Sequence, residues 1–114
     1  MLKTKPTKPS YFAYVIELEP ALLSNKRIAQ ANPGYLYQPD RPLLYVGMTG
    51  RTPEIRYEQH KAGYKASRYT RQNCVALRRD LFEHLGPMTR DEAIEMEVSY
   101  ANQLRSQGYA VWQN

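Results

Sequence analysis

Cysteine is nearly absent from this 114-residue sequence, which has only Cys74 and therefore no possible intrachain disulfide or cysteine-rich zinc site. No apolar run approaches the roughly 20 residues of a membrane-spanning helix, and residues 1–10 lack the apolar segment of a signal peptide. The sequence also has no glycine-rich phosphate loop, zinc-binding pattern, nucleophile elbow or internal repeat. These absences favour a reduced, cytoplasmic protein without a membrane partner.

The positive charge is concentrated in one part of the chain. The net charge is +5, from 16 basic and 11 acidic residues. Residues 50–79 hold eight basic and two acidic residues (+6), and the remainder holds eight and nine (−1). Tyrosines are interleaved with these basic residues, a pattern typical of surfaces that bind nucleic-acid phosphates, although a solvated basic face has the same composition. The candidate phosphate-binding cations are Lys61, Lys65, Arg68 and Arg71.

Length and composition indicate one folded domain. The chain is long enough to bury one hydrophobic core, and its 42% apolar and 24% charged residues are ordinary for a globular protein. Residues 1–10 contain three lysines and two prolines, and we expect them to form a flexible basic tail. A single domain is then expected over residues 11–114.

Short segments rich in β-branched and aromatic residues predict strands between proline- and glycine-rich breaks. These strands are expected at residues 11–18, 43–48 and 74–77, with an extended segment at 109–112. The first two can pair antiparallel, because the two dozen residues between them leave room for a short helix that Ser24 would cap.

Capping signals predict two longer helices. Thr52 followed by Pro53 is a strong helix start, and Gly63 can close this helix. Thr89 with Glu92 three residues later matches a capping box, and the helix that it starts should run to about residue 107. Strands mixed with helices over short connections predict an α+β domain.

Glu97 is the acidic residue of the last helix that is expected to face the core. On a helical wheel it lies at the centre of the apolar arc, whereas Asp91, Glu92 and Glu95 lie outside it. Burying an unpaired carboxylate costs several kcal/mol, so Glu97 requires a cation, hydrogen bonds or a metal ion. A structural Glu–Arg pair and a functional carboxylate both remain possible. The apolar arc consists of Ala93, Ile94, Met96, Val98, Tyr100, Ala101 and Leu104.

Arg56 and His60 are spaced four residues apart and therefore share one face of the Thr52 helix. They lie at the edge of a small apolar patch around Ile55, from which we expect them to reach into a cleft over the sheet. An arginine there can clamp a phosphate, and a histidine can transfer a proton. A merely solvated pair is the alternative.

Read in order, these residues resemble the GIY-YIG nuclease domain family. Tyr45-Val46-Gly47, followed by Met48-Thr49, matches the second half of the family's motif. Phe12-Ala13-Tyr14 stands where the Gly-Ile-Tyr half is expected, and only the tyrosine is kept.

The later motifs of the family also fall on residues of this chain. The arginine and histidine of the following helix fall at Arg56 and His60, with a basic loop at 65–70 after them. The metal-binding glutamate falls at Glu97, and a late asparagine is placed at Asn114.

The resemblance implies a small three-stranded antiparallel sheet flanked by helices, and cleavage of DNA with one divalent cation, Mg²⁺ or Mn²⁺. It implies that Glu97 holds the cation and that Arg56 neutralises the phosphate oxygens. Tyr14 is the candidate base for the attacking water, with Tyr45 and His60 in support and Asn114 completing the catalytic set. The implied nucleic-acid contacts are Gly47, Thr49, Lys61, Lys65, Ser67, Arg68 and Arg71.

Three functions remain open on sequence alone. The first is a metal-dependent endonuclease acting on duplex or branched DNA, with RNA not excluded, and the presence of Tyr14, Tyr45, Arg56 and Glu97 favours it. The second is an inactive nucleic-acid-binding module of the same fold, and the third is a protein-interaction domain with an incidental basic face. We expect a monomer or weak homodimer of low intrinsic sequence specificity.

Overall fold

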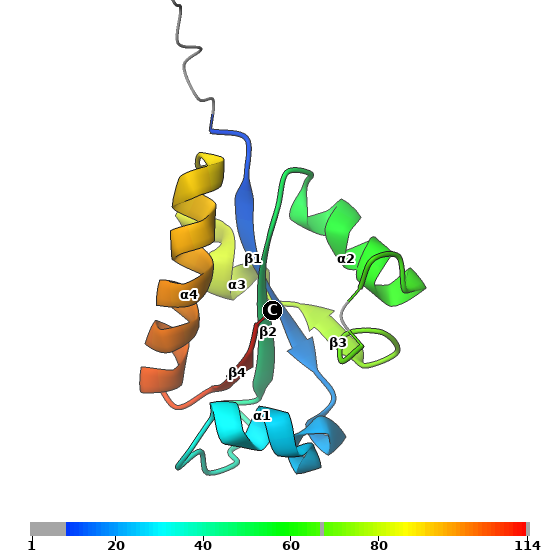
Figure 1. The fold of residues 1–114 in the computed structure, drawn as a ribbon, viewed down its shortest axis with the longest axis vertical. Helices are drawn as coiled ribbons and strands as arrows, with labels where there is room; N and C mark the ends of the chain where they lie inside the picture. The colour runs from blue at the N-terminus through cyan, green and yellow to red at the C-terminus, as the bar shows by residue number, and fades with distance from the viewer. Residues whose placement is uncertain (1–8, 67, 114) are drawn as a thin grey trace, which may run out of the picture.

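The computed structural model describes residues 9–66 and 68–113, which form one four-stranded sheet with helices around it (Figure 1). The strands are β1 (Phe12–Leu18), β2 (Leu43–Thr49), β3 (Cys74–Leu77) and β4 (Ala110–Trp112), in the order β3-β1-β2-β4. β1 pairs antiparallel with β2 and β3, but β4 pairs parallel with β2. The expected three-stranded antiparallel sheet is therefore wrong, because the segment after the last helix adds a fourth, parallel strand.

Asn32 closes the outer edge of β4. Its Nδ2 donates to the carbonyl oxygens of Val111 (3.0 Å) and Ile28 (2.8 Å), and its Oδ1 accepts from the backbone N–H of Val111 (2.8 Å). Arg105 Nε also donates to this Oδ1 (3.1 Å). Because an edge strand otherwise presents unpaired backbone groups, this one side chain takes the place of a neighbouring strand.

Asn32 reaches β4 from the connection between β1 and β2, which contains η1 (Pro20–Ser24) and α1 (Lys26–Ala31). The cap of α1 is Asn25, whose side chain accepts from the backbone N–H of Arg27 and Ile28. The expected cap, Ser24, instead donates its hydroxyl to the Ala21 carbonyl inside η1. The predicted cap was thus wrong by one residue, because serine and asparagine are both favoured at this position and the sequence does not distinguish them.

The two long helices, α2 (Pro53–Ala62) and α4 (Arg90–Ser106), lie on opposite faces of the sheet (Figure 1). Neighbouring residues of β1 show this, because Tyr14 bonds His60 of α2 while Ala13 packs in a cluster with Ala93 of α4. The short helices α3 (Arg79–Phe82) and η2 (Glu83–Leu85) join β3 to the start of α4. No helix within the described ranges is long and apolar enough to cross a membrane.

The predicted capping signals are confirmed. Thr52 Oγ1 accepts from the Ile55 N–H at 3.2 Å, and Gly63 ends α2 with a left-handed φ of 84°. Thr89 and Glu92 make both bonds of a capping box, at 3.2 and 2.8 Å. These local signals need no tertiary contacts, which is why the sequence predicts them well.

The helices bury different side chains from those expected in two places. α4 buries a narrow stripe that includes Ala93, Tyr100 and Leu104, while Ile94 and Val98 are 42% and 49% exposed. On α2, Ile55 is 46% exposed and His60 is fully buried, so the small patch around Ile55 does not mark the inner face. On α4 the buried stripe is thus narrower than the apolar arc, whereas on α2 the buried face differs from the apolar patch.

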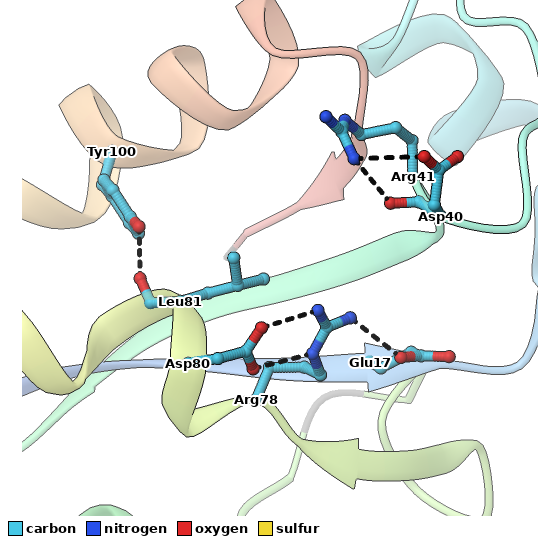
Figure 2. A network of polar contacts seen from close by, with 7 residues as sticks. All are labelled: Glu17, Asp40, Arg41, Arg78, Asp80, Leu81 and Tyr100. Atoms are coloured by element: carbon cyan, nitrogen blue, oxygen red, sulfur yellow. Dashed lines mark hydrogen bonds and ion pairs between the residues drawn. The ribbon is translucent and has the colours of Figure 1, made fainter.

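Two arginines of the basic segment, residues 50–79, form ion pairs within the fold and are therefore less available to bind phosphates. Arg78 bridges Glu17 of β1 (3.0 Å) and Asp80 of α3 (2.9 Å), as Figure 2 shows. Arg78 thereby lowers the pKa of Asp80. Arg79 pairs with Glu54 at 3.0 Å, which joins α3 to the start of α2. These two arginines therefore connect elements of the fold.

Candidate active site

The register of β1 and β2 places Tyr14 directly opposite Gly47. The side chain of Tyr14 lies across this glycine so closely that a Cβ there would be 2.6 Å from the phenol oxygen. The same Cβ would be 3.0 Å from the ring of Tyr45. Gly47 is therefore needed for the close approach of the two tyrosines, and its buried position lies beneath them rather than on the exposed surface.

A chain of hydrogen bonds begins at Tyr14 and runs through His60 of α2. The Tyr14 hydroxyl lies 2.7 Å from His60 Nε2, and His60 Nδ1 lies 2.9 Å from the hydroxyl of Thr70. Tyr14 is 1% exposed, and His60 and Thr70 are fully buried. The Tyr45 ring packs edge-on against the imidazole, with 5.2 Å between the centroids. The structure thus brings the predicted Tyr14, Tyr45 and His60 into one cluster.

Burial controls the protonation of this cluster. Burial raises the pKa of Tyr14, and the neighbouring Tyr45 adds to this, while Arg56 acts in the opposite direction. Arg56 alone would make Tyr14 a better base, but burial outweighs its effect. Burial, reinforced by the charge of Arg56, also lowers the pKa of His60 to about 4. Both groups are therefore uncharged at neutral pH.

Arg56 holds the start of the basic loop that follows α2. Its Nη1 donates to Gln59 Oε1 and the Tyr64 carbonyl (both 3.1 Å), and its Nη2 donates to the Lys65 carbonyl at 2.8 Å. Arg56 consequently has a structural role in the loop in addition to its place near Tyr14.

A basic groove of about 670 Å³ opens beside this cluster. Residues 48–51, at the end of β2 and in the following turn, form one wall, and Gln59 and Tyr64 contribute to the other. Three cations line the groove, Arg51, Arg56 and Lys65. A groove with cations on both walls is suited to a phosphate backbone.

Glu97 lies on α4, on the opposite face of the sheet from α2. It is half-buried, and burial raises the pKa of its carboxyl group. Its charge also acts, as the smallest of several influences, to raise the pKa of Tyr14. Across residues 9–66 and 68–113, neither an ion pair nor a hydrogen bond compensates this carboxylate. The structural Glu–Arg pair considered from sequence is therefore not formed within that part of the chain.

The remaining predicted contacts have different surroundings. Thr49 lines the groove, and its Oγ1 accepts from the Arg51 N–H at 3.0 Å. Lys61 is exposed but pairs with Glu58 at 3.1 Å, while Arg68 and Arg71 are exposed in the loop after the groove. Ser67 and Asn114 lie outside the described residues.

Two features of the site were not predicted from the sequence. Thr70 bonds His60, and no local pattern distinguishes this threonine from the polar loop around it. Trp112 lies opposite Tyr45 in the β2–β4 pairing and packs edge-on against Tyr69, with 5.1 Å between the centroids. Both contacts join segments far apart in sequence, so only the tertiary structure reveals them.

Fold and site together define a small α+β domain in which a buried tyrosine–histidine pair lies close to an arginine that lines a basic groove. A family comparison matches residues 35–110 to the GIY-YIG catalytic domain, and the chain belongs to this family of nucleases. The resemblance inferred from sequence is thereby confirmed, with nucleic acid as the substrate class. Tyr14 precedes the matched residues, so its place in the site rests on the β1–β2 pairing. Searches of curated proteins and of solved structures gave no match.

Proposed function

We propose that this protein is an endonuclease that hydrolyses DNA phosphodiester bonds with the help of one divalent cation. The observation that carries the proposal is the hydrogen-bonded Tyr14–His60 pair, whose tyrosine feels the charges of both Arg56 and Glu97, a half-buried carboxylate that has no ion pair or hydrogen bond among the described residues. Buried titratable groups of this kind, next to a groove lined by cations, are typical of an active site.

The protein residues divide the hydrolysis between them. As a water oxygen attacks phosphorus and the bond to the 3′ oxygen breaks, the water's proton passes to the Tyr14 oxygen. Tyr14 gives its own proton to His60 Nε2, which lies 2.7 Å away and is uncharged at neutral pH. Arg56 stabilises the negative charge that grows on the non-bridging oxygens. The low pKa of His60 keeps it uncharged at neutral pH and therefore able to accept this proton.

The chemistry of Glu97 fits a magnesium or manganese ion. Mg²⁺ takes oxygen ligands and is commonly bound by one or two carboxylates together with water and substrate phosphates. Over the described ranges no group of three metal-ligating side chains occurs, so Glu97 would be the main protein ligand. The cation would supply Lewis-acid stabilisation of the leaving 3′ oxygen.

An inactive nucleic-acid-binding module remains the second candidate, because the groove and the exposed Arg68 and Arg71 suffice for binding without chemistry. Charge reversal of Arg68 and Arg71 should weaken binding to all DNA sequences alike, and the salt dependence of binding should fall. Reversal of Arg27 and Arg90, two exposed arginines outside the basic segment, changes the net charge equally and serves as the control.

The decisive experiment incubates the protein with duplex, branched and single-stranded DNA, with and without Mg²⁺ or Mn²⁺. We expect metal-dependent cleavage that Glu97→Gln largely abolishes while DNA binding persists. Glu95→Gln is the matched control, because Glu95 is an exposed acid on the same helix. If folded Glu97→Gln cleaved DNA at the wild-type rate, Glu97 would have only a structural role. Binding without cleavage of any DNA by the wild type would favour the inactive module.

A further inference from the structure

We propose that Thr70 is a positioning residue that fixes the tautomer of His60, so that His60 Nε2 accepts the proton of Tyr14. This inference rests on the proposed nuclease chemistry for its consequence, but the tautomer itself can be measured independently of cleavage. The supporting contact is the 2.9 Å approach of the Thr70 hydroxyl to His60 Nδ1, between two fully buried side chains.

The hydrogen-bonding partners of Tyr14 determine the direction of the chain. Arg56 has only N–H donors and cannot accept the phenol proton. Within the described residues, the Tyr14 hydroxyl has one hydrogen-bond acceptor, His60 Nε2, and no hydrogen bond joins it to Glu97. Because burial keeps Tyr14 protonated, its O–H donates to Nε2. His60 must then carry its own proton on Nδ1, where the Thr70 oxygen accepts it.

Thr70 is itself held by the backbone at the end of the basic loop. Its carbonyl oxygen accepts from the Asn73 N–H at 3.2 Å and from Cys74 Sγ at 3.1 Å. Helix α2 is hydrogen-bonded to both ends of this loop. Arg56 bonds the carbonyl oxygens of Tyr64 and Lys65 at its start, and His60 bonds the Thr70 hydroxyl at its end. The Thr70 oxygen favours the Nδ1–H tautomer by accepting this proton, whereas in the Nε2–H tautomer the Tyr14 oxygen would accept from His60 and its own proton would need another acceptor.

The wrong tautomer would remove the acceptor for the Tyr14 proton without changing the shape of the site. Thr70→Val keeps the branched shape but removes the hydroxyl, whereas Thr70→Ser keeps the hydroxyl. We expect Thr70→Val to lower the single-turnover cleavage rate at saturating DNA by about tenfold or more, because it weakens acid–base assistance that is worth roughly 10²- to 10⁴-fold in total. Thr70→Ser should restore most of the rate, which a purely packing role would not produce.

The tautomer is measured by ¹⁵N NMR of the metal-free protein at pH 8. The chain has two histidines, and His84 is exposed, so a His84→Gln background leaves His60 as the single imidazole. We expect the Nδ1–H tautomer in this background and with Thr70→Ser, and a mixture or the Nε2–H form with Thr70→Val.

An Nε2–H tautomer in the His84→Gln protein would overturn the proposal, and this measurement needs no Thr70 variant to fold. An unchanged Nδ1–H tautomer in folded Thr70→Val would overturn it as well. If the tautomer responds as expected but no form of the protein cleaves DNA, the proposed nuclease function fails and the role of Thr70 in orienting His60 stands.

Discussion

Tyr14 and Gly47 face each other across β1 and β2, and the phenol of Tyr14 fills the space that a side chain at position 47 would occupy. This packing places the Tyr14 hydroxyl at His60, so the position of the proposed base depends on the absence of one Cβ atom. The glycine is required by space here and not by backbone conformation, because it lies within a regular strand.

Gly47→Ala should therefore impair catalysis more than stability. The added methyl displaces the Tyr14 hydroxyl from His60, and misplacement of a reacting group by about 1 Å costs on the order of 10²-fold in rate. Overpacking at this site should lower the free energy of unfolding by roughly 1–3 kcal/mol. Single-turnover cleavage and urea unfolding measure the two effects. Gly50→Ala adds the same methyl in the groove wall, where it would meet Tyr11 at 3.2 Å instead of Tyr14, so its rate at saturating DNA should fall less. Equal rate losses in both variants would contradict the role of Gly47.

Arg56→Ala should lower the cleavage rate at saturating DNA by roughly 10²-fold or more, because its charge is proposed to stabilise the transition state. Arg56→Lys should rescue only partly, since lysine lacks the planar fork that also bonds the Tyr64 and Lys65 carbonyls. Arg51→Ala, which removes another cation of the same groove, should mainly weaken binding. If Arg56→Ala raised only the DNA concentration needed for saturation, Arg56 would be a loop-positioning and binding residue.

His60 should make the protein less stable in mild acid. Its pKa is about 4 in the folded protein and about 6.5 when unfolded, so the unfolded chain binds more protons between these values. The free energy of unfolding is thus undiminished by His60 above pH 6.5, falls as the pH decreases toward 4, and then levels off. Between pH 7 and pH 5 the loss from this residue should be about 2 kcal/mol. Urea unfolding of wild type and His60→Gln at both pH values isolates the contribution of His60. Equal losses of unfolding free energy in the two proteins would refute the prediction.

The same histidine should influence the pH dependence of cleavage. His60→Ala removes the acceptor for the Tyr14 proton, and its effect on single-turnover cleavage should be smaller at high pH, where water activation needs less help. Parallel pH–rate curves for wild type and His60→Ala between pH 6 and pH 9 would leave His60 with a packing role only.

Asn32→Ala should destabilise the fold through β4. The substitution leaves the N–H and carbonyl of Val111 and the Nε of Arg105 without their Asn32 partner, which should cost about 2–4 kcal/mol. Asn102→Ala is the control, because Asn102 meets the same arginine through one exposed hydrogen bond and should cost within about 0.5 kcal/mol. Urea unfolding compares the two, and similar stabilities would show that β4 holds its place without Asn32.

The sequence alone determined the features that depend on local chemistry. Thr52, Gly63 and the Thr89–Glu92 box set the helix ends, because caps satisfy backbone groups within one turn. The motif residues Tyr45, Gly47, Arg56 and Glu97 identified the family, since their order along the chain is itself the signal.

Only the tertiary structure decided how distant segments meet. The parallel pairing of β4, its closure by Asn32 and the Thr70–His60 contact each join residues separated by intervening elements, and no local pattern encodes such a partner. The protonation of Tyr14 and His60 was likewise beyond the sequence, because burial, which the packed sheet and α2 produce, outweighs the nearby charges that the residue types suggest.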